Sequence, residues 1–334
     1  MVGVGVLSRW HVHATEYART VNEQEDAAVV AVWDEDAARG AKWADELAVP
    51  FEAELEALLA RGDVDAVVVT TPTNMHRDVI IEAARAGKHI FTEKVLAPSV
   101  AQCREIAEAV KQAGVQFCIS FPRQTIAPLR FAKQLIDEGK LGDVTLVRIR
   151  VAHDGATRDW LPAHFYDAEA CGGGAMIDLG AHGMYLSRWL LGEPVRVSSI
   201  FNHVTARQVE DNCVTLIEFE NRAIAINETA FVSWGGAYSV EIDGTEGGFW
   251  MLGPQDVRVR GKAFGDDRVW QSIDELPART IMPIPQWIAA MEGNGEIEFG
   301  MTEAVQLTEL MEAAYRSYYE NRTVPLTDVT RVTG

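Results

Sequence analysis

Two ionisable side chains, Asp178 and His182, could act together on one bound molecule. They stand four residues apart in GGGAMIDLGAHGMYLSRWLLG (172–192), where the apolar residues follow a helical pattern. Residues four apart lie on one face of a helix, so both side chains can converge on the same atoms of a bound molecule. An imidazole has an unperturbed pKa near neutrality, so His182 could exchange a proton there. The alternative is an ordinary local hydrogen bond between the two.

A carboxylate at the end of an apolar run offers a second kind of chemistry. The segment VVAVWDED ends in Asp34, which could accept hydrogen bonds from the ribose hydroxyls of a bound dinucleotide. Glu35 and Asp36 beside it would repel a 2'-phosphate, so this position favours NAD over NADP. The alternative is that Asp34 only caps the helix that follows.

The first residues predict a strand that runs directly into a helix, where a Rossmann domain binds a pyrophosphate. Gly3 and Gly5 begin like the glycine fingerprint, but only two residues precede Gly3, so we assign both glycines to the strand. A turn after Leu7 instead puts Ser8, Trp10 and His13 at the three fingerprint positions, with an indole where the backbone should approach the phosphates. The candidate cofactor contacts in this loop are Ser8, Arg9, Trp10 and His11.

The pair His11 and His13 raises the question of a metal site. We expect none, because no further histidine, cysteine or carboxylate cluster in the sequence completes a recognisable ligand set. The four cysteines stand far apart without CxxC pairs, which fits neither a zinc ribbon nor a disulfide framework.

The elements that must position these residues fall into two parts. Through about residue 120, short apolar runs alternate with helical patterns, which predicts βαβ units and a parallel sheet. After Phe121 we expect a helix near 125–138, a strand at 144–153, a helix at about 175–191 and consecutive strands between 194 and 260, which indicate an antiparallel sheet. We therefore predict an α/β protein with domains at 1–121 and 122–334. The first domain has predicted strands at 2–7, 27–33, 65–70, 88–92 and 115–120.

Composition limits the partners and the compartment. A formal net charge of -19 over 334 residues would repel nucleic acid and anionic lipid headgroups. The first residues do not read as a secretory signal, and no stretch is long and apolar enough to span a membrane, so we expect a cytoplasmic protein.

Several motifs occur in an order that is specific to one family. TP-x-N-x-H follows a predicted strand at 71–76, GKH at 87–89 precedes EK at 93–94, and GGG-x(3)-D-x(3)-H spans 172–182. Nearly the whole chain resembles the glucose-fructose oxidoreductase, inositol dehydrogenase and MocA (Gfo/Idh/MocA) family. The resemblance implies an N-terminal Rossmann domain and a C-terminal α+β domain with a large open, mostly antiparallel sheet.

The resemblance also implies a function, an NAD(P)-dependent dehydrogenase of a sugar, inositol or related polyol. For this reaction Lys94 could stabilise a developing alkoxide or share in the proton transfer, His182 is the candidate base, and Asp178 could orient the substrate or tune His182. Asp178 and His182 would face Glu93 and Lys94 from the other domain. The residues that would line the cofactor are Thr71, Pro72, Asn74, His76, Glu93 and Lys94.

The sequence departs from the family pattern at two places. One is the loop with Ser8, Trp10 and His13, and the other is Val95, where the family usually has proline. If the family bond is cis, Val95 would either adopt a cis bond at a cost of about 3 kcal/mol or remain trans and aim Lys94 differently.

Substrate contacts are expected in the polar and aromatic segment VAHDGATRDWLPAHFYD (151–167) and near it. Two other functions stay open: an NAD-retaining enzyme that cleaves glycosides by transient oxidation, and a dinucleotide sensor without catalysis. An open sheet is commonly covered by a second subunit, so we expect a homodimer or homotetramer. The candidate substrate contacts are Arg123, His153, Arg158, Trp160 and His164.

Overall fold

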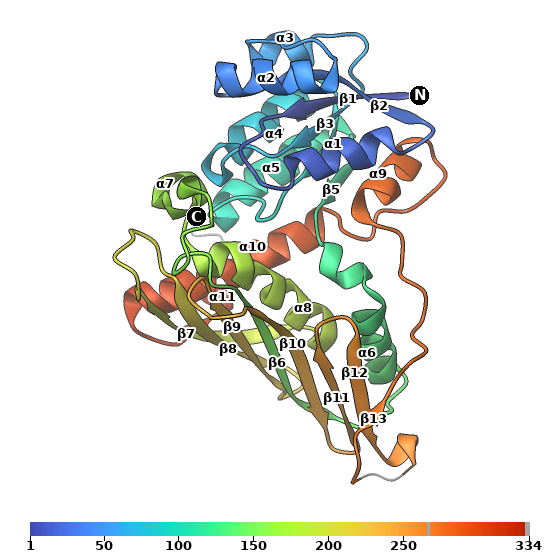
Figure 1. Ribbon diagram of the computed structural model, residues 1–334, viewed down its shortest axis with the longest axis vertical. Coiled ribbons are helices and arrows are strands. Elements are labelled where there is room, and N and C mark those ends of the chain that lie inside the picture. The colour runs from blue at the N-terminus through green and yellow to red at the C-terminus, as the bar shows by residue number, and fades with distance from the viewer. Residues whose placement is uncertain (266–267, 331–334) are drawn as a thin grey trace. The chain divides into compact units, whose positions relative to one another are not determined.

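A computed structural model describes residues 1–265 and 268–330, which form two compact units (Figure 1). The first unit contains residues 1–121 and 281–308, and the second contains residues 122–280 and the chain from Glu309 onward. The second unit therefore follows Phe121, whereas the segment 281–308 packs with the first unit. Within the described residues, no helix has both the length and the apolar character needed to cross a membrane.

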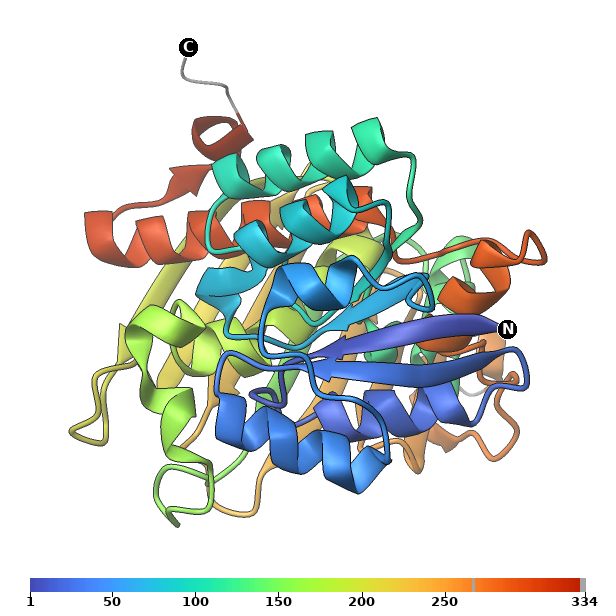
Figure 2. The ribbon, with the colours of Figure 1, turned by 90° about the horizontal axis from the view of Figure 1, so that it is seen from above.

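The first unit is built on a five-stranded parallel sheet in the order β2-β1-β3-β4-β5. Helices α4 and α5 lie on one side of it and α1 on the other (Figure 2). This confirms the predicted Rossmann domain. The strands are β1 Val2–Leu7, β2 Ala27–Trp33, β3 Ala66–Val69, β4 His89–Thr92 and β5 Phe117–Ile119, and the helices are α1 Ala14–Asn22, α2 Ala37–Leu47, α3 Leu55–Leu59, α4 His76–Arg85 and α5 Val100–Ala113.

Gly3 and Gly5 lie within β1, as predicted, and close packing explains why they are glycines. A Cβ atom on Gly3 would come within 1.9 Å of the Asp63 carbonyl oxygen, and one on Gly5 would meet a Leu58 methyl at 2.8 Å. The space beside the strand is therefore already filled by the chain that leads into β3.

Helix α9 (Pro283–Met291) adds a late segment of the chain to the first unit. Trp287 is fully buried and packs against Phe91 of β4 with ring centroids 5.8 Å apart. Ile119 in β5 donates its amide hydrogen to the carbonyl of Phe299. The long helix α10 (Met301–Glu320) begins in this unit and continues into the second.

The second unit is built on a nine-stranded sheet in the order β13-β12-β11-β10-β6-β9-β8-β7-β14. Only the β6–β9 pair is parallel, so the mostly antiparallel sheet is confirmed. The strands are β6 Val144–Ala152, β7 Pro194–Asn202, β8 Asn212–Phe219, β9 Ile224–Ala230, β10 Ala237–Gly244, β11 Gly247–Leu252, β12 Asp256–Gly261, β13 Gln271–Ser272 and β14 Val324–Pro325.

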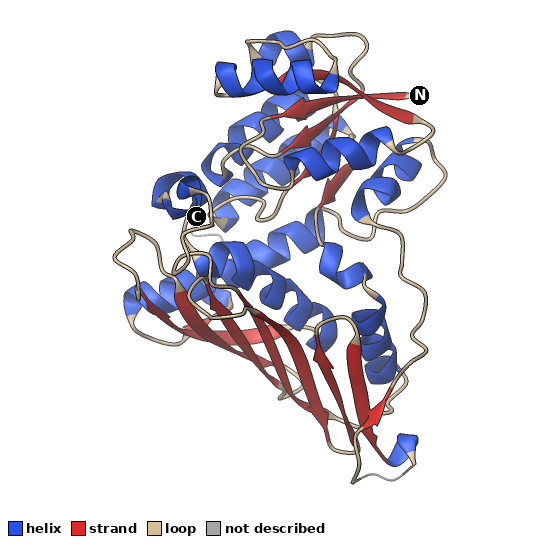
Figure 3. Ribbon diagram, in the orientation of Figure 1, coloured by secondary structure: helices blue, strands red, loops and turns tan. Residues whose placement is uncertain are grey.

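Helices cover one face of this sheet and leave the other open (Figure 3). Alternate residues of β8 show the difference, because Cys213 and Ile217 are buried whereas Val214 and Leu216 are exposed. The helix predicted at 175–191 consists of a π-helical turn, η4 (Met176–Gly180), followed by α8. The remaining helices of the second unit are α6 Ala127–Asp137, α7 Ala168–Cys171, α8 Ala181–Leu191 and α11 Thr327–Thr330.

Candidate cofactor and substrate sites

The turn after β1 is formed by a serine in a backbone conformation that glycine normally adopts. Ser8 is fully buried and has a φ angle of 75°. Its hydroxyl accepts a hydrogen bond from the Trp10 amide at 3.0 Å, and its carbonyl accepts one from the Thr70 hydroxyl at 2.7 Å. These contacts hold the left-handed conformation that a side chain otherwise disfavours. Ser8 therefore takes the first fingerprint position, as the sequence predicted.

Many backbone amides of the loop between β1 and α1 already donate hydrogen bonds to acceptors in the protein. The Arg9 amide donates to Asp34, the His11 amide to the Thr70 carbonyl, the His13 amide to the His11 ring, and the Ala14 amide to the His11 carbonyl. A glycine-rich loop keeps such amides for a pyrophosphate. Here most of them are already used, which is the structural consequence of the altered fingerprint.

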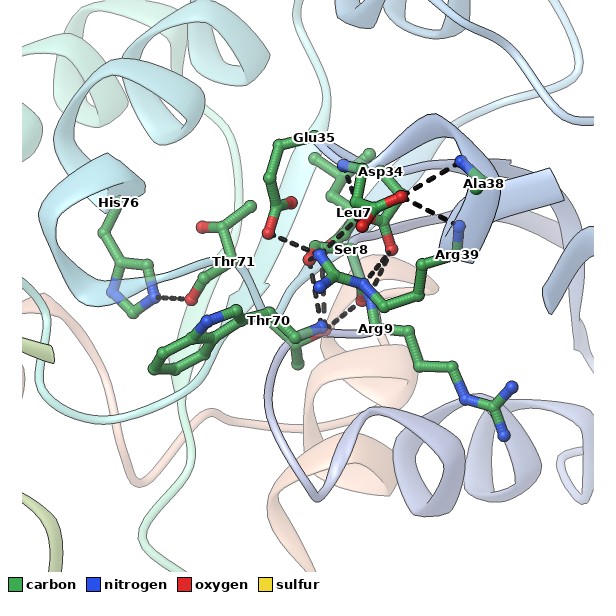
Figure 4. A network of polar contacts seen from close by, with 12 residues as sticks. Leu7, Ser8, Arg9, Asp34, Glu35, Ala38, Arg39, Thr70, Thr71 and His76 are labelled. Atoms are coloured by element: carbon green, nitrogen blue, oxygen red, sulfur yellow. Dashed lines mark hydrogen bonds and ion pairs between the residues drawn. The ribbon is translucent and has the colours of Figure 1, made fainter. Parts of the chain in front are cut away.

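Asp34 lies directly after β2, and its side chain has no exposed surface. Its two oxygens accept from the Arg9 amide (2.8 Å), the Asp36 amide (2.8 Å), and Nε and Nη2 of Arg39 (2.9 and 2.6 Å), as Figure 4 shows. The cap of α2 is not Asp34 but Asp36, which accepts from the amides of Ala38 and Arg39. The alternative that Asp34 caps this helix is therefore wrong.

Glu35 extends the same network toward solvent. Its Oε1 accepts from Arg39 Nη2 at 2.6 Å, and its side chain is 22% exposed. Burial raises the pKa of Glu35, partly offset by a hydrogen bond from the Ser8 hydroxyl and by the charge of Arg39. Arg9 points its guanidinium to a different carboxylate, that of Glu46.

The TP-x-N-x-H motif forms the turn between β3 and α4. His76 is buried, with Nδ1 2.9 Å from the Val95 carbonyl oxygen and Nε2 3.1 Å from that of Thr71. It joins this turn to the segment after Lys94 instead of facing solvent. Asn74 is exposed, whereas the buried Thr71 Oγ1 has no hydrogen-bond partner within the described residues. Thr71 thus retains a polar atom that a bound group could satisfy.

The structure brings a third ionisable side chain to the two histidines of the loop. Glu93, directly after β4, lies with one oxygen 4.0 Å from His11 Nε2 and the other 3.5 Å from His13 Nδ1. The Tyr17 hydroxyl donates to Glu93 and contacts the Ser120 hydroxyl at 2.7 Å. The expectation that no carboxylate completes this set was wrong, because strand order places Glu93 beside the loop.

Hydrogen bonding in this cluster favours protons over a metal ion. Because His11 Nδ1 accepts the His13 amide hydrogen, the neutral ring carries its proton on Nε2, the atom that faces Glu93. A nitrogen in that state has no lone pair for a cation. Burial alone would raise the pKa of Glu93, but its interactions with His11, His13 and Lys94 outweigh burial and hold that pKa well below its usual range.

Lys94 follows Glu93 and is also buried, with 5% of its surface exposed. The peptide bond from Lys94 to Val95 is cis, the first of the two alternatives considered for this position. Val95 and Leu96 are buried beside it.

In the second unit, Asp178 belongs to η4 and His182 to the first turn of α8. His182 is buried, and its Nδ1 lies 3.0 Å from the Tyr185 hydroxyl. Burial lowers the pKa of His153, and the neighbouring carboxylates of Asp178 and Asp154 partly offset this effect. The structure therefore brings one predicted substrate residue, His153, into the electrostatic neighbourhood of Asp178.

Glu210 and Tyr315, which sequence reasoning missed, hold the glycine turn before η4. Buried Glu210 accepts hydrogen bonds from the amides of Gly174 (2.8 Å) and Met176 (3.1 Å), and from the Tyr315 hydroxyl (2.6 Å). A Cβ atom on Gly173 would lie 1.9 Å from that hydroxyl, so this close approach requires glycine. No local pattern in the sequence could have found Glu210, because it lies 36 residues after the glycine from whose amide it accepts a hydrogen bond.

Three of the five predicted substrate residues are linked, because Trp160 and Arg158 both contact Asp154 and His153 packs on Trp160. His153 stacks on Phe231 with ring centroids 5.0 Å apart and packs against Trp160 at 4.7 Å. Arg158 lies over the ring of Trp234, 5.3 Å from its centroid. Two others have separate contacts: Arg123 lies over Tyr238 at 4.1 Å, and the His164 ring packs on Phe165 at 4.9 Å.

Comparison with known proteins defines the class. The profile of the oxidoreductase family with an NAD-binding Rossmann fold matches residues 1–121, and the profile of the GFO/IDH/MocA C-terminal domain matches residues 129–250. The protein is thus of the NAD(P)-dependent oxidoreductase class, with a nucleotide-binding Rossmann domain. The chain belongs to the Gfo/Idh/MocA family, which confirms the resemblance seen in its motifs.

Three relatives illustrate the similarity. The scyllo-inositol 2-dehydrogenase (NAD(+)) of Bacillus subtilis strain 168 is 33% identical over 63% of this chain, a match that covers only 59% of the relative. The inositol 2-dehydrogenase of Rhizobium meliloti strain 1021 is 26% identical over 98% of both chains. The solved structure of GenD2 from gentamicin A biosynthesis, in complex with NAD, has a TM-score of 0.82 at 26% identity and covers 97% of this chain and 96% of GenD2.

Proposed function

We propose that this protein is an NAD-dependent dehydrogenase that moves hydride between nicotinamide and a hydroxyl or keto carbon of a sugar, inositol or related polyol. One observation carries the proposal: Glu93 and Lys94 are both buried directly after β4, in a unit that matches the family's NAD-binding profile. The names of the two inositol dehydrogenases among the relatives support the substrate class.

The residues of the first unit are compatible with a dinucleotide. The carboxyl ends of β1, β2 and β3 carry Ser8, Asp34 and Thr71, where parallel α/β sheets bind their ligands. Thr71 Oγ1, buried and without a partner among the described residues, would hydrogen-bond the cofactor. Bound NAD supplies the ring that accepts or donates the hydride. We propose NAD over NADP because Glu35 and Asp36 add negative charge beside Asp34.

The proton chemistry is assigned to two side chains. Lys94, buried and cationic, would stabilise negative charge on the substrate oxygen. His182 would take the hydroxyl proton at Nε2, which requires Nδ1 to carry the ring proton and to donate it to the Tyr185 hydroxyl. Asp178 would orient the substrate, and the neighbouring His153 would contribute a substrate hydrogen bond.

The test is an oxidation assay of the purified protein with NAD and a panel of inositols, aldoses and polyols, following the nicotinamide absorbance. With an accepted substrate, Lys94→Met and His182→Asn each lower kcat about 100-fold or more, as expected for a group that stabilises the developing charge and for a general base. The matched controls are Lys111→Met and His203→Asn, exposed residues of the same types, which leave kcat unchanged. Turnover that survives both active-site substitutions would contradict the assignment.

A dinucleotide sensor is the second candidate. It is favoured by the loop between β1 and α1, whose backbone amides mostly donate hydrogen bonds within the protein. It predicts saturable NADH binding with no turnover of any substrate in the panel. A glycoside-cleaving enzyme that retains NAD would instead release sugar without net NADH formation, and denaturation would liberate the bound nucleotide.

A further inference from the structure

Asp34, the acidic residue expected to contact the adenosine ribose, has no acceptor capacity to spare. A carboxylate offers about four lone-pair sites. All are used, by two backbone amides and by two nitrogens of Arg39, at distances between 2.6 and 2.9 Å. Its side chain has no exposed surface. A ribose hydroxyl could reach it only by displacing one of these donors.

The contacts of Asp34 show what it does instead. Its oxygens hold the loop after β1 through Arg9, its own turn through Asp36, and helix α2 through Arg39. Helix α2 approaches so closely that a Cβ atom on Gly40 would lie 2.5 Å from the Asp34 Cβ. Asp34 therefore links three segments of the chain from a buried position.

The polar groups beside it that remain partly exposed are those of Glu35 and Arg39. Their side chains are 22% and 30% exposed and share a hydrogen bond of 2.6 Å. Arg39 Nη1 makes no hydrogen bond to any described residue. Asp34, Glu35 and Arg39 together carry one net negative charge. Because the Asp34 side chain is buried, the carboxylate that a ligand can reach is that of Glu35.

We infer that Glu35, positioned by Arg39, contacts the adenosine ribose and excludes a 2'-phosphate, while Asp34 acts as a positioning residue. This inference rests on the proposed binding of NAD. A carboxylate can accept from the ribose hydroxyls but repels a phosphate dianion at the same place. Without the charge of Glu35, the Arg39 guanidinium would face that phosphate as a favourable partner.

The experiment measures the dissociation constants of NADH and NADPH by energy transfer from tryptophan to nicotinamide. The wild-type protein should bind NADH at least about tenfold more tightly, the effect of one nearby charge at a partly exposed site. Glu35→Gln and Glu35→Ala should each shift the NADPH to NADH ratio by about tenfold toward NADPH, with a smaller change for NADH itself. Asp34→Asn should weaken both cofactors together and lower the melting temperature.

Asp45→Asn is the control, because it removes the same charge from an exposed position on helix α2, which carries Arg39. It should leave the ratio unchanged. If wild type prefers NADH, and the ratio moves in Asp34→Asn but not in the Glu35 variants, Asp34 is the ribose contact and the inference is overturned. Equal affinity of wild type for both cofactors also overturns it. If wild type binds neither cofactor, the proposed function fails.

Discussion

The Tyr315 hydroxyl donates a hydrogen bond of 2.6 Å to Glu210, the carboxylate that also accepts from the amides of Gly174 and Met176. Burial raises the pKa of Tyr315 well above its ordinary value, and the negative charge of Glu210 adds to that shift, so the phenol keeps its proton. The pair thereby fixes the start of the helical segment that carries Asp178 and His182.

Tyr315→Phe should lower the free energy of unfolding by about 1–3 kcal/mol, because it removes a hydrogen bond to a buried charged acceptor. The measurement is urea denaturation followed by circular dichroism. Tyr319→Phe, at a side chain that is 75% exposed, is the matched control and should behave like wild type. Equal stability of Tyr315→Phe and wild type would show that the contact does not hold the turn.

Gly3→Ala should destabilise the protein by about 1–3 kcal/mol or more, because the added methyl meets a backbone carbonyl that cannot move aside. Gly62→Ala has open space around the added methyl and should be neutral. The two variants are compared by thermal unfolding. If Gly3→Ala instead weakened NADH binding without loss of stability, Gly3 would be part of a phosphate loop and not a strand residue.

Part of this fold could be predicted from the sequence. The bounds of β1 and β2 matched the predicted strands 2–7 and 27–33, because buried parallel strands form uninterrupted apolar runs. The approach of Glu93 to His11 and His13 could not be predicted, because a local pattern does not contain strand order. The packing of 281–308 on the first unit was missed for a related reason, since periodicity gives the buried face of a helix but not its partner.

The ion pair of Asp34 with Arg39 is a different case. It lies within five residues of sequence, and an arginine in the first turn of a helix that follows an aspartate could have been considered. It was missed because Asp34 was interpreted only as a ligand contact or a cap.

Acid stability should depend on Glu93. Its pKa is lowered in the folded protein, because its interactions with His11, His13 and Lys94 outweigh the effect of burial. The stability it contributes is therefore complete above the unfolded pKa of about 4.3 and is lost as the pH falls below it. Unfolding free energies measured between about pH 6 and pH 3 should fall less steeply in Glu93→Gln than in wild type. An unchanged slope would mean that the pKa of Glu93 is the same in the folded and the unfolded protein.

The histidine and glutamate cluster should hold no tightly bound metal. Elemental analysis of the purified protein should find substoichiometric zinc, and chelator treatment should leave NADH binding unchanged. The reason is the proton that the hydrogen bond to His11 Nδ1 leaves on Nε2. Stoichiometric zinc that disappears in His13→Ala would contradict this.

The open face of the second sheet should mediate self-association. Ile200, Val214 and Leu216 are 69%, 41% and 45% exposed, and Ile200 lies opposite Val214 in the register of β7 and β8. The double variant Ile200→Glu/Leu216→Glu should shift the protein to a monomer in light scattering after gel filtration, because carboxylates are costly to bury. Gln112→Glu on α5 is the control, and a wild-type monomer would refute the expectation.

The π-helical turn Met176–Gly180 has a consequence for how this chain can change. Such a turn contains one residue more than the α-helical turn it replaces. Loss of a single residue between Asp178 and His182 would restore a regular helix and rotate one side chain relative to the other by about 100°. Their alignment thus depends on residue count as well as on residue type, because a one-residue deletion that preserves both groups would change their spacing from four residues to three and re-aim one against the other.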